Sequence, residues 1–238
     1  MRSTGTGWTV PPKRQRNRRV PDLDHVEDVL RRFVRDFPDA VILGGWSTYL
    51  RAAVAKSHDI DVIVDHPTLD KLKAKHELSA SQHVSGRKFE MKVDGVGVDV
   101  YPVYQSRLGQ KLKLPVEALI ERTDRVGGVR VLTVEAQFVA KMAALLDRPD
   151  SLAGEKDRRE MVALLKADPS PKLQTSVDLL QRAGWPRDRQ QPLWEQTFDF
   201  LLETDGLGAR DKAALKLGRA EALMATRTRD REEPEMER

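Results

Sequence analysis

The sequence predicts an α/β fold of the α+β kind, in which a mixed sheet flanked by helices is followed by a helical C-terminal region. Short apolar or alternating runs typical of strands occur only in the first 132 residues. After them, apolar residues recur at helical intervals. We therefore divide the chain into a basic tail (1–20), a mixed-sheet domain (21–132), a helical domain (133–225) and a charged tail (226–238).

Composition limits the kind of protein. A chain of 238 residues that is 39% hydrophobic can bury a core. No apolar run approaches the length of about eighteen residues that a membrane span needs, and no apolar stretch follows the N-terminal basic cluster, so we expect a soluble, cytoplasmic protein. Because the chain has no cysteine, disulfides, thiolate zinc sites and cysteine nucleophiles are excluded, and any metal must be held by oxygen or imidazole.

The charge balance is mildly basic, with a net charge of +4 and a pI near 9.3, and favours contact with polyanions. Residues 1–20 carry clustered Lys and Arg without periodic apolar positions. They predict a flexible basic tail that is either solvated or in contact with RNA phosphates. Trp and Tyr are too sparse to form an aromatic ladder for single strands.

The first elements alternate between helix and strand. Asp22 can cap an amphipathic helix that ends before Pro38. Residues 40–43 form a short apolar run that predicts a buried strand. The glycine pair at 44–45 predicts a tight turn into a helix near residues 47–55.

A second strand is predicted over residues 59–64, and a charged helix over 68–77. Residues 88–93 and 96–101 flank Asp94-Gly95, a dipeptide that strongly favours a hairpin turn. The region therefore contributes three strands to a sheet.

The remaining elements are mostly helical. We expect a short helix at 117–122 and a strand at 129–132, after which Thr133 caps a helix. Further helices separated by Gly or Pro are predicted within three ranges: 155–166, 172–183 and 191–225. Residues 226–238 are almost wholly charged, and we expect them to fray.

Asp59 and Asp61 form the first candidate site. Two residues apart on a strand, they point their carboxylates to the same face. Two such anions are stabilised by a cation, and oxygen ligands suit Mg²⁺ or Mn²⁺. The alternative is a strand end whose aspartates simply face water.

Two features favour the metal site. The glycine pair at 44–45 lets backbone N–H groups at a helix N-terminus approach a phosphate. Asp99 lies on the face opposite its valine neighbours in the return strand of the hairpin, so it can join Asp59 and Asp61. Three carboxylates could hold two ions, one lowering the pKa of an attacking hydroxyl and the other bridging a triphosphate.

Several cations and a histidine lie near this cluster. Lys141 sits on an otherwise apolar helix, where it either points into a cleft or extends its charge to solvent. Arg51 and Lys56 could neutralise a triphosphate or belong to a solvated face. His58 alternates to the face opposite Asp59, which favours a structural role.

The order Gly-Gly, Asp-x-Asp and a later strand aspartate resembles the nucleotidyltransferase superfamily, whose members have a polymerase-beta-like fold. The similarity continues through 114–120, 129–134 and 138–145 to Arg148 and Lys156-Asp157. This order, over roughly residues 40–165, is similar to AbiEii-type toxins and their MenT relatives. Trp46, where many members have a small residue, and the longer spacer before Lys156 are departures.

The resemblance implies an enzyme that uses Mg²⁺ and a nucleoside triphosphate (NTP, ATP among the candidates) to modify the 3′ end of tRNA, as the toxin partner of an antitoxin. It implies that Asp59 and Asp61 hold the metal and that Asp99 also helps to activate the acceptor. The implied catalytic residues are Asp59, Asp61, Asp99 and Lys141, and the implied nucleotide-binding residues are Gly44, Gly45, Ser47, Lys56, Lys141, Lys156 and Asp157.

Three alternatives remain. Glu90-Met91-Lys92, with Asp59 or Asp61 as the upstream acid, resembles the metal site of restriction-type nucleases. A nucleotidyltransferase could instead act on a small molecule. A non-catalytic domain of the same type could bind RNA or a partner protein.

Overall fold

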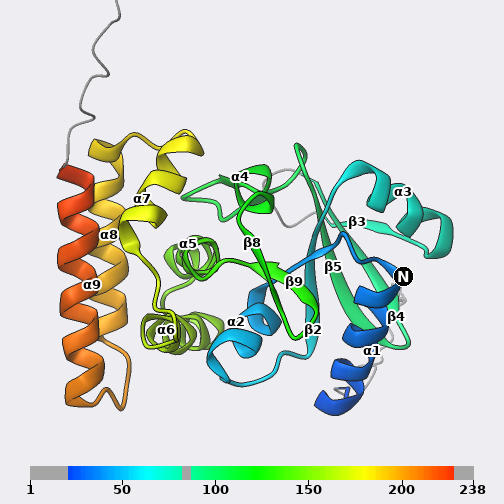
Figure 1. The fold of residues 1–238 in the computed structure, drawn as a ribbon, viewed down its shortest axis with the longest axis horizontal. Helices are drawn as coiled ribbons and strands as arrows, with labels where there is room; N and C mark the ends of the chain where they lie inside the picture. The colour runs from blue at the N-terminus through cyan, green and yellow to red at the C-terminus, as the bar shows by residue number, and fades with distance from the viewer. Residues whose placement is uncertain (1–20, 82–86, 228–238) are drawn as a thin grey trace, which may run out of the picture.

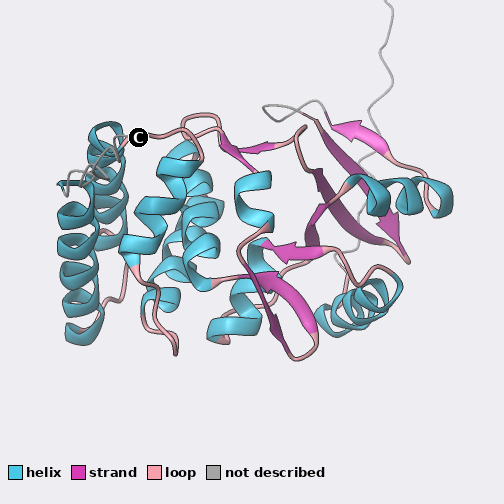
Figure 2. Cartoon of the chain, turned by 45° about the horizontal axis from the view of Figure 1, so that its top comes forward, coloured by secondary structure: helices cyan, strands magenta, loops and turns pink. Residues whose placement is uncertain are grey.

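The computed structural model describes residues 21–81 and 87–227. The sheet and its helices occupy one half of the molecule, and the C-terminal helices stack beside it (Figures 1 and 2). The expectations for the tail at 1–20 and for residues 228–238 fall outside the described residues.

The described residues contain a seven-stranded sheet with the order β3-β4-β5-β2-β1-β9-β8. Its strands are β1 (Val41–Leu43), β2 (Asp59–Val64), β3 (Ser79–Ser81), β4 (Lys88–Val93), β5 (Val96–Pro102), β8 (Thr123–Val126) and β9 (Val129–Leu132). β2 runs parallel to β5 and β1 parallel to β9, while the other neighbours are antiparallel, so the sheet is mixed as predicted. A separate pair is formed by β6 (Arg107–Leu108) and β7 (Leu114–Pro115).

Helices flank the sheet and then complete the chain. Those within the sheet region are α1 (Leu23–Asp36), α2 (Gly44–Ala52), α3 (His66–Lys75) and α4 (Glu117–Ile120). Those after the last strand are α5 (Val134–Asp147), α6 (Leu152–Leu165), α7 (Leu173–Arg182), α8 (Arg187–Leu202) and α9 (Ala209–Arg227). The mixed sheet with flanking helices and a helical C-terminal region is the fold class that the sequence predicts.

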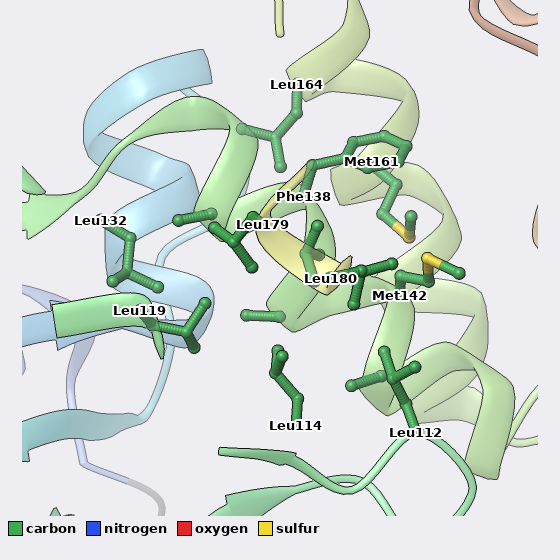
Figure 3. Packing of buried hydrophobic residues seen from close by; sticks show 14 of the residues in the cluster. Leu112, Leu114, Leu119, Leu132, Phe138, Met142, Met161, Leu164, Leu179 and Leu180 are labelled. Atoms are coloured by element: carbon green, nitrogen blue, oxygen red, sulfur yellow. The ribbon is translucent and has the colours of Figure 1, made fainter. Parts of the chain in front are cut away.

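Two hydrophobic clusters cover opposite faces of the sheet. The smaller one joins α1 and α3 to alternate residues of β2 and β5, including Val62 and Val98. This arrangement fixes the orientation of the intervening aspartates, because successive strand side chains point to opposite faces. The larger cluster fills the space between the sheet and α5 to α9, and Figure 3 shows part of it around Phe138. It draws on residues from both sides of position 132, so the proposed domain boundary there stays a prediction.

Most predicted elements are present, with differences at short or polar ones. β3, β6, β7 and β8 were not predicted; β8 reads Thr-Asp-Arg-Val and is an edge strand, so it lacks an apolar pattern. α2 begins at Gly44 rather than near Ser47, because Gly44 adopts a positive φ of 66° and enters the helix directly from β1. Among the described residues, no helix is both long and apolar enough to cross a membrane.

Candidate active site

Three aspartates meet at one cavity on the face of the sheet away from α1. In the parallel register of β2 and β5, Asp61 lies opposite Asp99 and Asp59 lies opposite Gly97. All three aspartates line a cavity of about 490 Å³, which we call the carboxylate cavity. The prediction that they share one face is therefore confirmed by the strand register.

The electrostatics of this cavity disfavour negative charge in the absence of a cation. Burial, and then the neighbouring charge of Asp99, raise the pKa of Asp61 to about 7. Burial also raises the pKa of Asp99, although Lys88 Nζ lies 2.7 Å from Asp99 Oδ2 and opposes that rise. Tyr101 Oη lies 3.5 Å from Asp61 Oδ1. A cation shared by these carboxylates would therefore stabilise the site.

The N-terminus of α2 forms the wall next to the aspartates. A Cβ added to Gly44 would lie 2.2 Å from Asp61 Oδ2, so only glycine permits this approach. A Cβ on Gly45 would lie 2.8 Å from the Cβ of Ser57 and 3.3 Å from Lys156 Nζ. The first N–H groups of a helix lack intrahelical acceptors, and the helix dipole is positive there. This wall is suited to a phosphate group.

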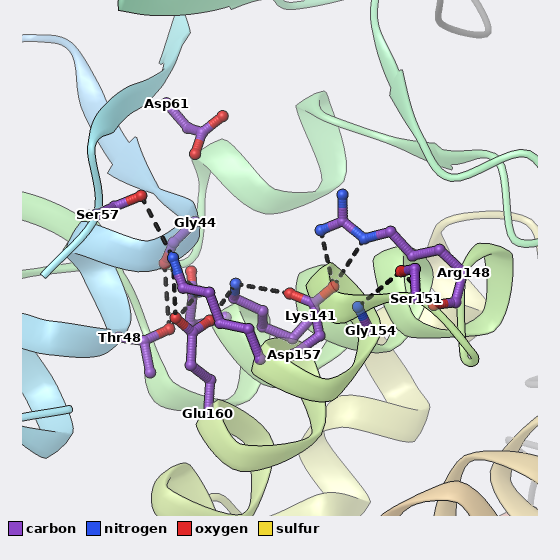
Figure 4. Close-up of polar contacts among 12 residues, drawn as sticks. Gly44, Thr48, Ser57, Asp61, Lys141, Arg148, Ser151, Gly154, Asp157 and Glu160 are labelled. Carbon is purple, nitrogen blue, oxygen red and sulfur yellow. Dashed lines mark hydrogen bonds and ion pairs between the residues drawn. The ribbon is translucent and has the colours of Figure 1, made fainter. Parts of the chain in front are cut away.

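Helices α5 and α6 line the cavity beside α2 and carry a buried ionic network (Figure 4). Lys141 Nζ donates to Asp157 Oδ1 at 3.0 Å and also pairs with Glu160. Arg148 Nε and Nη2 donate to Asp157 Oδ2 at 2.9 and 2.7 Å. Burial opposes the charge on Lys141, but Glu160 and Asp157 outweigh it and raise the pKa of Lys141. Lys141 is thus a charged lysine with two carboxylate partners.

Lys156 is held less tightly than Lys141. Its Nζ lies 3.5 Å from Ser57 Oγ and 3.7 Å from Glu160 Oε1, and its side chain is 43% exposed. Because its carboxylate contact is long, Lys156 can move toward an incoming anion without breaking a short ion pair. It lies in the same wall as Gly45 and Ser57.

The structure brings most, but not all, of the predicted site residues together. Those lining the carboxylate cavity are Gly44, Gly45, Asp59, Asp61, Asp99, Lys141, Lys156 and Asp157. Ser47 lies in α2, which begins at Gly44 rather than near residue 47, and it is fully buried and does not line the cavity. Lys56 instead pairs with Asp24 and Glu27, each at 2.8 Å.

Two further expectations concerned residues beside the predicted cluster. Arg51 Nε donates to Leu132 O at 2.7 Å, and its Nη2 pairs with Asp124, so Arg51 ties α2 to the β8–β9 hairpin. His58 Nδ1 lies 3.3 Å from Pro21 O, which agrees with a structural role. Neither residue lines the carboxylate cavity.

Sequence reasoning missed several residues of the cavity wall. Tyr101 could have been found, because it lies two positions along β5 from Asp99, and Ser57 comes only two residues before Asp59. Gln137 precedes Lys141 by four residues on α5, so it shares the same helix face. Leu108 and Gly109 reach the cavity through the β6–β7 segment, for which the sequence holds no comparable signal.

The donor atoms of the three carboxylates suit a divalent cation, but their side chains lie too far apart in this structure to hold one together. Within residues 21–81 and 87–227, no group of three His, Cys, Asp or Glu side chains lies close enough to hold a metal ion. The facing pair Asp61 and Asp99 nevertheless offers oxygen donors only, and the raised pKa of Asp61 reports that negative charge there is unbalanced. Oxygen donors of this kind suit Mg²⁺ or Mn²⁺.

No family model matches the chain, and no curated protein is significantly similar to it in sequence. Among solved structures, a candidate nucleotidyltransferase from Thermotoga maritima is 21% identical, with 49% of this chain and 83% of that chain covered and a TM-score of 0.39. An antigenic nucleotidyltransferase-like protein from Paracoccidioides brasiliensis is 18% identical, with 76% and 93% covered and a TM-score of 0.41. The antibiotic-resistance factor ANT(2'')-Ia is 15% identical, with 73% and 95% covered and a TM-score of 0.44. Because these TM-scores lie below 0.5, residue roles in this chain rest on its own geometry.

Proposed function

We propose that this protein is a Mg²⁺-dependent nucleotidyltransferase that transfers a nucleoside monophosphate from an NTP to an acceptor hydroxyl. The observation that carries the proposal is the carboxylate cavity, in which Asp59, Asp61 and Asp99 lie beside the glycine N-terminus of α2. Anionic oxygens that bind a metal and backbone N–H groups that bind phosphate are the two parts that phosphoryl transfer needs.

In this proposal the triphosphate lies along the wall formed by Gly44, Gly45 and Lys156. Lys156 contributes charge, and the first N–H groups of α2 donate to phosphate oxygens. Lys141 and Asp157 stay in the nucleotide-binding set because both line the cavity, where their ion pair also anchors Arg148. Ser47 and Lys56 lose their proposed direct contacts, since neither lines the cavity.

The reaction forms one bond and breaks another at the α-phosphorus. The acceptor hydroxyl oxygen bonds to that phosphorus, the bond to the bridging oxygen breaks, and pyrophosphate leaves. Asp99 accepts the hydroxyl proton. Asp59, Asp61 and Asp99 would hold Mg²⁺, which when bound would supply positive charge for the triphosphate.

For the acceptor we propose the 3′ end of tRNA, with the protein acting in the cytoplasm as a toxin that a cognate antitoxin restrains. Support comes from the resemblance to AbiEii-type toxins and MenT relatives and from the net charge of +4, which favours a polyanion. A small-molecule acceptor would use the same cavity.

A metal-dependent nuclease is the second candidate, because of one observation. Glu90 on β4 lies opposite Asp99 in the β4–β5 register, so the Glu90-x-Lys92 pair borders the aspartates. Glu90 and Lys92 do not line the carboxylate cavity, however, and this scheme assigns no role to Gly44 and Gly45. We therefore rank it second.

The test is incubation of the purified protein with total tRNA, Mg²⁺ and each radiolabelled NTP in turn. The Asp59→Ala and Asp61→Ala variants serve as inactive controls, and Asp70→Ala, at an exposed position on α3, serves as the matched control. We expect label on tRNA with the wild-type protein and Asp70→Ala only. Label on an added small molecule instead of tRNA would show that the acceptor is a small molecule. Shortening of tRNA in the absence of an NTP would favour the nuclease. If the wild-type protein binds Mg²⁺-nucleotide but labels nothing, the non-catalytic alternative gains support.

A further inference from the structure

Gln137 connects α5 to the phosphate-facing end of α2. Its side chain is fully buried and lines the carboxylate cavity. Gln137 Nε2 donates to Gly44 O at 2.8 Å and lies 2.9 Å from Thr48 Oγ1. Thr48 Oγ1 in turn donates to Gly44 O at 3.1 Å. The carbonyl of Gly44 is therefore held by two side chains.

The orientation of the Gln137 amide follows from its partners. A backbone carbonyl oxygen can only accept, so the nitrogen of the amide must face Gly44 O. Oε1 then remains, and among the described residues it has no hydrogen-bond partner. A buried acceptor without a donor is unfavourable, and such groups usually meet water or a ligand. The unpaired oxygen is itself buried, and the two contacts that Gln137 makes here are those that Nε2 donates.

The Gly44 peptide is confined on two sides. On one side it approaches Asp61 so closely that a Cβ at position 44 would lie 2.2 Å from Asp61 Oδ2. On the other side Gln137 holds the carbonyl. The direction of this peptide sets the direction of the N–H groups in the first turn of α2. A small rotation of the turn would turn those groups away from an anion in the cavity.

We propose that Gln137 is a positioning residue for the triphosphate of the bound nucleotide, an inference that rests on the proposed function. Its Nε2 fixes the Gly44 peptide so that the N-terminal N–H groups of α2 face the carboxylate cavity. Gln137 also lies one helical turn before Lys141, so one face of α5 carries both the contact to the N-terminus of α2 and part of the ionic network.

The experiment compares two buried glutamines. Gln137→Met removes the amide with little change in length, and Gln190→Met does the same on α8, away from the cavity. Gln190 is also fully buried, and its Nε2 donates to Val177 O at 3.1 Å and Trp185 O at 2.7 Å. Binding of each Mg²⁺-NTP is measured by calorimetry, and thermal unfolding is measured without ligand.

We expect both variants to lose thermal stability but only Gln137→Met to bind the preferred Mg²⁺-NTP more weakly, by about tenfold. Equal affinities of Gln137→Met and wild type would overturn the inference and leave the proposed function intact. Equal weakening by both variants would also overturn it, because the effect would then be general destabilisation. If wild type itself binds no Mg²⁺-NTP, the proposed function fails and takes the inference with it.

Gln137→Glu provides a second variant if the methionine variant does not fold. It keeps the shape of the side chain, but it replaces the Nε2 that donates to Gly44 O and Thr48 Oγ1 with a carboxylate oxygen, which can only accept. We expect it to weaken Mg²⁺-NTP binding at least as much as Gln137→Met does. Wild-type affinity in folded Gln137→Glu would contradict the positioning role.

Discussion

Asp61 and Asp99 face each other across the parallel strands β2 and β5, and the charge of Asp99 is one cause of the raised pKa of Asp61. The two residues are 38 positions apart in sequence, but their register makes them neighbours in the sheet. Lys88 lies 2.7 Å from Asp99 and thereby compensates one member of the pair. Asp61 has no such short ion pair among the described residues, so it has more to gain from a bound cation.

This relationship predicts how stability depends on pH without metal. The pKa of Asp61 is about 7 in the folded protein against 3.8 ordinarily, so the folded protein keeps a proton that the unfolded chain releases. Stability should therefore fall as pH rises from about 4 to about 7, by on the order of 2–4 kcal/mol. Asp61→Asn should remove most of this dependence and should be more stable than wild type at pH 8. Urea unfolding with a chelator present measures both.

The same experiment has a control and a metal arm. Asp70→Asn, at an exposed position on α3, should keep the pH dependence of the wild-type protein. Mg²⁺ should stabilise wild type more than Asp61→Asn at pH 8, since it binds only the folded site. A flat pH profile in wild type would show that the charge on Asp61 is already balanced.

The buried network around Lys141 predicts a large loss of stability when the lysine is removed. Lys141→Met would leave Asp157 and Glu160 with less compensation in a buried position, at a cost of about 3–5 kcal/mol. Adding Glu160→Gln should recover part of this loss, because one of the uncompensated charges disappears. Urea unfolding of the single and double variants measures the coupling. Additive effects would show that the two side chains act independently.

The candidate aspartates could be found from sequence because the strand period fixes their direction. Asp59, Asp61 and Asp99 each alternate with apolar residues that α1 and α3 bury, so no long-range information was needed. The sequence pattern did not predict that β2 pairs directly with β5, which places Asp61 opposite Asp99. One helix and two strands lie between β2 and β5 along the chain, so local patterns do not specify this pairing.

The predicted places of two site residues, Ser47 and Lys56, were wrong, because each depends on where a helix begins or on a partner distant in sequence. The resemblance implied that Ser47 contacts the triphosphate, but α2 begins at Gly44, whose φ is positive, and Ser47 is buried in its first turn. Lys56 was assigned by nearness in sequence, whereas its partners Asp24 and Glu27 lie on α1. Such pairings depend on how helices pack, which local patterns do not specify.

The narrow gap beside Gly45 predicts a selective effect on ligand binding. Gly45→Ala would place its Cβ 2.8 Å from Ser57 Cβ and 3.3 Å from Lys156 Nζ, so these side chains must move away from the phosphate wall. We expect Mg²⁺-NTP affinity to fall by about tenfold or more. Gly208→Ala is the matched control, because its nearest neighbour would be Asp211 Oδ2 at 3.6 Å. Calorimetry would contradict this account if both alanine variants bound like wild type.

Lys156 should affect binding without affecting folding. Its side chain is 43% exposed and its ion pair with Glu160 is 3.7 Å long, so Lys156→Met should change the free energy of unfolding by less than about 1 kcal/mol. Removing its charge should nevertheless weaken Mg²⁺-NTP binding by about tenfold at low salt, and by less as salt rises, because screening reduces the contribution of an exposed charge. Lys212→Met, which changes an exposed lysine on α9, should leave affinity unchanged at every salt concentration. Calorimetric titrations at two ionic strengths distinguish the outcomes. If Lys156→Met lost the same affinity at both, the lysine would shape the wall rather than neutralise a phosphate. If Lys156→Met lost no affinity, the triphosphate would lie elsewhere in the cavity.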